Sequence, residues 1–392
     1  MTGTPVARRA STPPWRNVRV LRIVAQIVTL AVVLIVGWWL LDNLFTNLRR
    51  IGLGLGFDFL NTTAGFDIGE TVVAYSARDT YRDAFLVGLA NTLVISALGI
   101  VLATLLGIVT GIARLSNNFL ISRIAAGYVE LMRNTPLLVQ LVLIYAVMLQ
   151  LPAISSSIDV GGMVFLNQRG LFLPRPVAGQ GFGLWASLAV IGLFVAVALF
   201  VIAARREANG RAAGRLRLGG TATLAAALIG GWLVAGGPLM LDVPVRERFN
   251  FVGGVRVSPE LTALLFGLVI YTAAFIGEVV RGGIQSVRRG QIEAANAIGL
   301  SDMQTLRLVV FPQALRVIVP PLTSQYLNLA KNSSLAIAVG FADLFSVSRN
   351  MANQTGQPIP VIVLVMATYL LISLLTSLAM NLYNRRVQVL ER

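Results

Sequence analysis

Four long stretches without a charged residue constrain this chain more than any other feature. They are residues 23–41, 84–113, 183–204 and 359–384. Each exceeds the roughly 18 apolar residues that a helix needs to cross a lipid bilayer. A membrane β-barrel would instead show segments of about 10 residues in which apolar and polar side chains alternate. Because these stretches are continuous, the sequence predicts an all-α integral membrane protein.

The composition agrees with a membrane protein and limits its chemistry. Only 12% of the residues are charged, whereas an average soluble domain has about 25%. The mean hydropathy is +0.76. The chain has no cysteine and no histidine. Disulfides, thiolate chemistry, histidine metal sites and histidine general bases are therefore excluded.

Hydropathy predicts about eight transmembrane helices in total. The first follows five arginines and is longer than the apolar region of a cleaved signal peptide, so we expect a retained anchor. The predicted spans are residues 23–41, 84–113, 122–149, 183–204, 218–240, 261–280, 319–342 and 359–383.

The distribution of basic residues predicts how these spans are oriented. With a cytoplasmic N-terminus, the inner segments hold 21 basic and 5 acidic residues, and the outer segments hold 10 basic and 11 acidic residues. Cytoplasmic loops carry the excess of arginine and lysine, so both termini are expected inside. The net charge of +15 is then spread over short loops at one membrane face. This favours contact with lipid head groups over contact with nucleic acid.

Residues 281–331 hold the most informative pattern of the chain. Residues 286–298 can form a short helix on the predicted cytoplasmic side, and Gly299 can end it as a C′ glycine. A projecting helix of this kind can dock on a partner protein or lie at the membrane surface as a plain connector. The residues alone leave both alternatives open. A second, capped helix and then a turn back into the membrane are predicted by Ser301, Gln304, Pro312, Pro320 and Pro321.

The same stretch contains a family pattern. Glu293-Ala294-Ala295 is followed after three residues by Gly299 and later by Phe311-Pro312. This arrangement resembles the EAA loop of bacterial binding-protein-dependent ABC permeases. The segments that resemble the polar amino-acid branch of that family are RGGIQSV at 281–287, GQIEAANAIGLS at 290–301, FPQALR at 311–316 and LAKNSSLA at 329–336.

The resemblance extends to the first half of the chain. Asn91-Thr92-Leu93 is similar to the start of the branch's first core helix, and ELMRNTPLLVQ at 130–140 is similar to its second. In total the resemblance covers about residues 84–150 and 260–390. The sequence KNSS at 331–334 departs from the commoner K-x-T-S of the family, and this change is conservative.

The resemblance implies the transmembrane domain of a type I ABC importer, whose core has five spans. The second, third, sixth, seventh and eighth predicted spans would form this core. The implied units are a cytoplasmic arm, extra helix and outer loop at 1–83, the first part of the core at 84–150, inserted periplasmic loops with a transmembrane hairpin at 151–259, and the second part of the core with its coupling loop at 260–392.

The resemblance also implies a function. A chain of this kind is expected to be a permease subunit that moves amino acids across the bacterial inner membrane. The substrates would be general L-amino acids or the glutamate, glutamine, aspartate and asparagine group. The expected partners are ABC ATPase subunits that bind ATP and magnesium, a second and unlike permease, a periplasmic amino-acid-binding protein and membrane lipid. No enzyme activity and no cofactor are expected in this chain.

The sequence supports a separate ATPase. A phosphate-binding P-loop requires a glycine-rich G-x-x-x-x-G-K-[ST] pattern, and the only lysine, Lys331, stands between Ala330 and Asn332. An ion-gradient-driven secondary transporter remains the alternative. Such a protein would be expected to show internal repeats, which the sequence lacks, and several intramembrane acids, for which Glu278 is the one candidate.

Two groups of residues are candidates for function. Coupling to the ATPase is assigned by resemblance to Arg289, Gln291, Glu293, Ala294, Ala295 and Gly299. Polar residues in apolar spans are candidates for the substrate path, because such residues are costly in a membrane. The path candidates are Asn91, Gln140, Glu278, Asn328, Lys331 and Ser333.

Four of the path candidates also have a structural alternative. Lys331 can face a substrate carboxylate, pair with Glu278 or snorkel to the membrane surface. Glu278 can form an ion pair with Arg281 three residues further on. Glu130 and Arg133 have the same spacing at the start of the third span. The side chains that can either line a cavity or bond between helices are those of Asn91 and Gln140.

Overall fold

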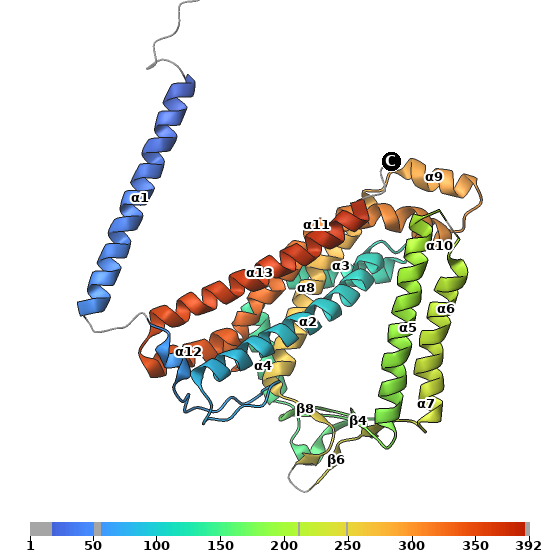
Figure 1. Cartoon of the computed structure of the whole chain (residues 1–392), viewed down its shortest axis with the longest axis horizontal. Coiled ribbons are helices and arrows are strands. Elements are labelled where there is room, and N and C mark those ends of the chain that lie inside the picture. Colours follow the sequence, from blue (N-terminus) through green and yellow to red (C-terminus); the bar gives the residue numbers. More distant parts are fainter. Residues whose placement is uncertain (1–17, 51–55, 211, 248–249, 389–392) are drawn as a thin grey trace, which may run out of the picture.

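The structure is a computed structural model that describes residues 18–50, 56–210, 212–247 and 250–388. The predicted N-terminal arm before Val18 lies outside these residues. Long helices dominate the fold (Figure 1), as the predicted class requires. The helices are α1 (Val18–Arg50), α2 (Tyr81–Arg114), α3 (Phe119–Asn134), α4 (Leu137–Leu149), α5 (Phe182–Ala208), α6 (Gly214–Ala225), α7 (Gly231–Val234), α8 (Pro259–Gln285), α9 (Arg289–Ala297), α10 (Asp302–Thr305), α11 (Phe311–Asn332), α12 (Leu344–Thr355) and α13 (Pro358–Gln388).

In the described part of the chain, 7 helices are long and apolar enough to cross a membrane, or 8 if the bent pair α3–α4 counts as one span. The third predicted span, 122–149, is divided into α3 and α4, which meet at a bend of 107°. The break lies at Thr135, whose backbone is extended, and Pro136 precedes α4. Proline disfavours helical geometry in the residue before it, which explains the break.

The seventh predicted span begins earlier than expected. The helix runs from α10 through a π-helical turn at Leu306–Val310 into α11, and it ends in a 3₁₀ turn at Ser333–Ala338. Pro320 and Pro321 lie inside α11. The expectation that these two prolines turn the chain back into the membrane is wrong, since the helix continues through them.

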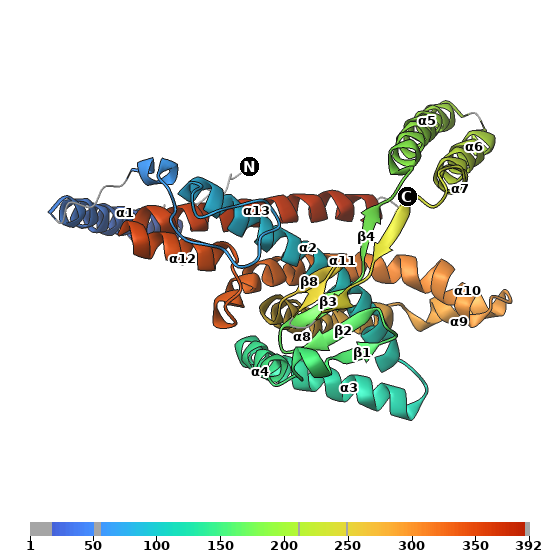
Figure 2. The ribbon, with the colours of Figure 1, turned by 90° about the horizontal axis from the view of Figure 1, so that it is seen from below.

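The core is built around α2 and α8, which make the most extensive helix–helix contact of the molecule. Glycines allow this close approach. A Cβ atom on Gly107 would lie 2.5 Å from Ile276, and one on Gly111 would lie 2.7 Å from the carbonyl oxygen of Gly277. Helices α3, α4 and α11 also pack on α8, while α12 and α13 pack together beside them. Figure 2 shows this group from the side of the strands.

The two inserted loops contain short antiparallel strands that the sequence did not predict. Four strands form a sheet in the order β1-β2-β3-β8, and β4–β5 and β6–β7 form two further pairs. The ring of Phe251 lies 4.7 Å from that of Phe165 and 4.6 Å from that of Phe172. The strands are β1 (Ile158–Val160), β2 (Val164–Asn167), β3 (Gly170–Leu173), β4 (Arg175–Ala178), β5 (Leu239–Asp242), β6 (Val245–Arg246), β7 (Phe251–Val252) and β8 (Val255–Val257).

Helix α1 and the hairpin α5–α7 stand apart from the core (Figures 1 and 2). None of the most apolar window of α1 is buried inside the chain. The hairpin packs mainly on itself, where Gly192 faces Ala227 and Trp185 donates a hydrogen bond to the carbonyl oxygen of Leu228 at 3.0 Å. These helices present most of their apolar side chains outward, as helices in contact with lipid do.

Candidate functional site

Helix α9 projects from the end of the core (Figure 1). It begins later than the predicted helix at 286–298, because α8 continues to Gln285 and Ser286 forms its C-cap. Gly299 ends α9 in the left-handed conformation, with φ of 83°. Its N–H donates to the carbonyl oxygen of Asn296, and the N–H of Leu300 donates to that of Ala295 at 3.1 Å. This pair of bonds is a Schellman motif, which gives α9 a defined end.

The side chains of α9 divide between an inner and an outer face. Ala295 is 3% exposed, and Ile292 packs against the core cluster that contains Val287 and Val310. Glu293 and four more of the predicted coupling residues are exposed. These four are Arg289, Gln291, Ala294 and Gly299.

Contacts with α10 and α11 hold α9 in place. Ser301 and Gln304 form the predicted capping box at the start of α10, with the N–H of Ser301 donating to Oε1 of Gln304 at 2.9 Å. Gln313 of α11 donates to Oε1 of Gln291 at 3.5 Å. Because α10 and α11 belong to one continuous helix, these contacts join α9 to a helix of the core.

Glu278 lies inside a cage of arginines near the end of α8. Arg281 donates to Glu278 from the same helix at 3.0 Å, Arg114 of α2 pairs with it, and Arg133 of α3 lies 3.8 Å away. The side chains of Glu278 and Arg114 are only 19% and 17% exposed. The predicted pair of Glu278 with Arg281 is confirmed, and the sequence missed that two further helices converge on the same carboxylate.

The predicted pair of Glu130 with Arg133 is absent among the described residues. Arg133 turns toward Glu278 instead, and its guanidinium lies 5.3 Å from the ring centre of Phe275. Since α3 ends at Asn134, directly before the bend, this contact ties the bend to α8.

Asn91 is buried and fully engaged. Its Nδ2 donates to the carbonyl oxygens of Glu70 and Ala342, both at 2.8 Å, and its Oδ1 accepts from the N–H of Val72 at 3.3 Å. Asn91 thus joins α2 to the loop before it and to the turn before α12. Of its two predicted roles, lining a cavity or bonding between helices, the geometry of Asn91 fits the second.

Gln140 closes the bend between α3 and α4. Its Nε2 donates to the carbonyl oxygens of Met132 at 2.9 Å and Thr135 at 3.0 Å. These oxygens belong to the end of α3, where carbonyl groups lack helical partners. Oε1 of Gln140 is buried without a partner in the described part of the chain.

The candidates around Lys331 are not brought together. Asn328 and Lys331 lie one turn apart on an exposed face of α11, whereas Ser333 is buried and donates to the carbonyl oxygen of Ala330 at 2.8 Å. No carboxylate of the described residues lies within 4.0 Å of Lys331. The pairing of Lys331 with Glu278 is therefore not found, and Lys331 presents its charge to the surroundings of the chain.

Sequence reasoning also missed Asp343. This residue is completely buried, its Oδ1 accepts from the N–H of Ser346 at 2.9 Å, and Tyr369 of α13 donates to its Oδ2 at 3.3 Å. The one local feature of the sequence that could have indicated Asp343 is its position as the N-cap of α12. No group of three or more metal-ligating residues occurs among the residues described.

Comparison with known proteins identifies the family of this chain. The family described as "Binding-protein-dependent transport system inner membrane component" matches residues 249–389. The putative amino-acid ABC transporter permease protein YhdX of Escherichia coli is 46% identical over 93% of this chain and 93% of its own length. The general L-amino acid transport system permease protein AapQ of Rhizobium johnstonii is 44% identical over 94% of this chain and 92% of its own.

A third relative is the glutamate/glutamine/aspartate/asparagine transport system permease protein BztB of Rhodobacter capsulatus, which is 39% identical over 94% of both chains. All three matches span nearly the whole chain. They support an ABC permease over an ion-gradient-driven secondary transporter. The chain therefore belongs to the family of amino-acid ABC transporter permeases, multi-pass inner-membrane components of binding-protein-dependent transport systems.

Proposed function

We propose that this chain forms part of an amino-acid import pathway and receives its ATPase subunit on helix α9. The observation that carries the proposal is the exposed face of α9, which presents Glu293 and Ala294 beyond the end of the core. Glu293 has no ion-pair partner within the described residues, so its charge is available to a basic group of the ATPase. The Schellman motif at Gly299 gives the helix the rigidity that force transmission requires.

The proposed orientation has α9 and both termini in the cytoplasm and the inserted strands outside. It rests on the excess of arginines in the predicted inner segments, which include the segment that forms α9. The four predicted units, 1–83, 84–150, 151–259 and 260–392, then become an N-terminal anchor, two halves of one permease core and a periplasmic insertion with its own hairpin.

The proposed partners follow from this arrangement. ATP and magnesium would be bound by the ATPase, and an amino-acid-binding protein would deliver substrate at the opposite face. A second, unlike permease would complete the pathway against the face of α11 that carries Asn328 and Lys331. Lys331 is exposed and unpaired in the described chain, and its ammonium suits a substrate carboxylate. Relatives are named for general L-amino acids and for the glutamate, glutamine, aspartate and asparagine group.

The substitution Glu293→Lys tests the docking of the ATPase. We expect the variant chain to fold but to lose most of the co-purifying ATPase and of the ATP hydrolysis that a loaded binding protein stimulates. The matched control is Glu207→Lys, which reverses an exposed acid of the hairpin that pairs with Arg217. If the two variants, Glu293→Lys and Glu207→Lys, retain the same amount of bound ATPase subunit and the same stimulated ATP hydrolysis, α9 is not the docking site.

The orientation has a direct test because the natural chain has no cysteine. Single cysteines at Asn296 of α9 and Asp159 of β1 can be labelled with a membrane-impermeant maleimide. We expect N296C to react only in inverted membrane vesicles and D159C only in spheroplasts. The reverse pattern would overturn the proposed orientation.

A further inference from the structure

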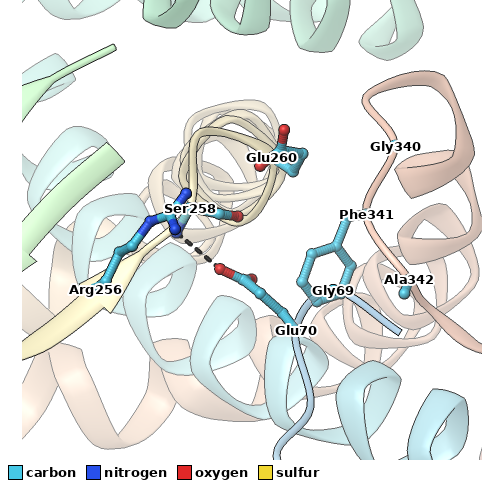
Figure 3. Close-up of a pocket in the computed structure, with 8 residues that line it drawn as sticks. All are labelled: Gly69, Glu70, Arg256, Ser258, Glu260, Gly340, Phe341 and Ala342. Carbon is cyan, nitrogen blue, oxygen red and sulfur yellow. Dashed lines mark hydrogen bonds between the residues drawn. The ribbon is translucent and has the colours of Figure 1, made fainter. Parts of the chain in front are cut away.

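A cavity of about 480 Å³ lies at the start of α8, at the opposite end of that helix from α9 (Figure 3). A volume of this size is typical of small-molecule sites. Three stretches that are distant in sequence build its wall: the loop before α2, strand β8 with the start of α8, and the turn before α12. The residues that carry the argument are Glu70, Arg256, Ser258, Glu260 and Phe341.

Two carboxylates give the cavity a negative side. Oε1 of Glu70 accepts from the N–H of Ser258 at 2.9 Å, while its Oε2 is buried without a hydrogen-bond partner in the described residues. Oε1 of Glu260 accepts from the hydroxyl of Tyr145 at 2.9 Å. Each carboxylate is thus held by one oxygen only. A buried acceptor without a donor is unfavourable, so the Glu70 side chain would gain by turning Oε2 toward a ligand with N–H donors in the cavity.

Arg256 gives the same cavity a positive side. Its Nε donates to the carbonyl oxygen of Arg169 at 3.0 Å, and its remaining guanidinium N–H groups have no acceptor among the residues described. No ion pair within 4.0 Å joins Arg256 to Glu70 or Glu260. Figure 3 shows these three charged groups around one open space. Opposite charges that face a shared cavity without pairing form a dipolar site.

We infer that this cavity binds the head group of a free α-amino acid, with the ammonium at Glu70 and Glu260 and the carboxylate at Arg256. The two glutamates and Arg256 leave the cavity with one net negative charge, so a simple anion is repelled, while a simple cation leaves the guanidinium of Arg256 without a partner. A zwitterion satisfies both sides. The apolar ring of Phe341 and the glycine backbone beside it leave the rest of the cavity to the side chain of the amino acid.

This inference rests on the proposed function, because the proposed orientation decides on which side of the membrane the cavity opens. If α9 is cytoplasmic, the cavity opens on the outer side, where substrate arrives. It would then hold an amino acid between its release from the binding protein and its movement past Lys331. The anchoring of the wall supports a preformed site, because Asn91 binds the backbone of Glu70 and that of Ala342 together.

The test uses the complete complex of this chain with its second permease and ATPase in lipid nanodiscs, without binding protein. Radiolabelled L-glutamine is the probe, and glycine, methylamine and acetate are competitors. We expect glycine to displace the probe and the two single-charge competitors to fail. Displacement by methylamine as well as glycine would show a plain cation site, suited to a lysine or arginine of a docked protein, and would overturn the inference.

Variants locate the binding in this cavity. Glu70→Gln keeps an acceptor for the N–H of Ser258 and removes the charge, and Arg256→Gln removes the guanidinium. Each is expected to weaken glutamine binding about 10-fold or more, as the loss of a charge-assisted hydrogen bond does. The control is Arg246→Gln, an exposed arginine of the same insertion that donates to the carbonyl oxygen of Ser155, and its binding should equal that of the natural chain.

Failure of this inference is distinct from failure of the proposed function. If both cavity variants bind glutamine like the natural complex, the amino acid binds elsewhere and the inference is wrong. Import and stimulated ATP hydrolysis by the natural complex would still stand in that case. If the complex does not assemble with an ATPase at all, the proposed function itself fails.

Discussion

Helix α8 of the core and the helices of the inserted hairpin are all apolar enough to cross a membrane but have different surroundings. In α8, 56% of the most apolar window is buried inside the chain, compared with 17% in α5 and 11% in the helix formed by α6 and α7. The difference shows that hydropathy specifies a place in the membrane and does not specify packing. A helix that is apolar enough to cross a membrane can be the structural centre of the core or an addition that faces lipid.

The two regions also use different contacts. The core is joined by long-range polar contacts, such as those of Glu278 and Asn91, which connect three or more segments each. The hairpin is joined by local ones, such as the contact of Gly192 with Ala227. Lipid tails are as apolar as leucine, so helices associate in membranes through close packing and polar contacts. Substitutions that remove polar side chains or close helix contacts should therefore lower the stability of the core and leave that of the hairpin unchanged.

The largest effect is expected for Glu278→Gln. The substitution leaves three arginines from three helices without their shared carboxylate, and breaking a pair of this kind costs about 3 kcal/mol. We expect a marked loss of thermal stability in the purified chain, measured by size-exclusion chromatography after heating. The control is Glu130→Gln, an exposed acid of α3 that has no salt bridge among the described residues. Equal melting temperatures of the two variants would show that the contacts of Glu278 with the three arginines do not stabilise the core.

The next effect concerns close packing. Gly111→Val would place a side chain within 2.7 Å of the backbone of α8 and force the two central helices apart, at a cost of about 1–3 kcal/mol. Gly37→Val is the matched change in α1, where an added Cβ meets nothing within 4 Å. Thermal unfolding should be lowered by the first change and unaffected by the second. Lower stability of Gly37→Val would mean that α1 packs on a protein surface.

Local signals predicted the parts of the fold that depend on neighbouring residues. The apolar runs predicted the spans, and Gly299 with Ser301 and Gln304 predicted the end of α9 and the start of α10, because capping involves residues within one turn. The strands escaped prediction since each has only two to four residues, too few to show an alternating pattern.

The candidate site was predicted less completely, because its geometry depends on distant segments. The i,i+3 spacing predicted the contact of Glu278 with Arg281, but Arg114 and Arg133 come from other helices and their approach has no signature in spacing. Arg133, near the end of α3, lies close to Glu278 of α8 and not in an ion pair with Glu130. Long-range polar contacts of this kind are the part of the core that the sequence pattern did not contain.

A smaller effect is expected for Asn91→Ala. The change leaves the carbonyl oxygens of Glu70 and Ala342 without a donor, and an unsatisfied buried group costs about 1–2 kcal/mol. Ser187→Ala is the hairpin counterpart, because Ser187 donates only to Gly183 of its own helix. Hydrogen exchange of the loop before α2 should rise in the first variant and stay unchanged in the second. An unchanged loop in Asn91→Ala would show that Asn91 does not anchor it.

The smallest effect is a pH dependence that the core has and the hairpin lacks. Burial raises the pKa of Glu70 above its ordinary value of 4.5, with Glu260 adding to the shift while Ser258 and Arg256 oppose it. The folded chain thus holds this proton more tightly than the unfolded chain. The stability from Glu70 is then complete below pH 4.5 and is lost as the pH rises through the folded pKa. Relative to the natural chain, Glu70→Gln should become more stable as the pH rises above 4.5. Ser187→Ala in the hairpin changes no titratable group, so its melting temperature should show no such trend. A parallel trend in both variants would mean that the hairpin is not the passive addition that its packing indicates.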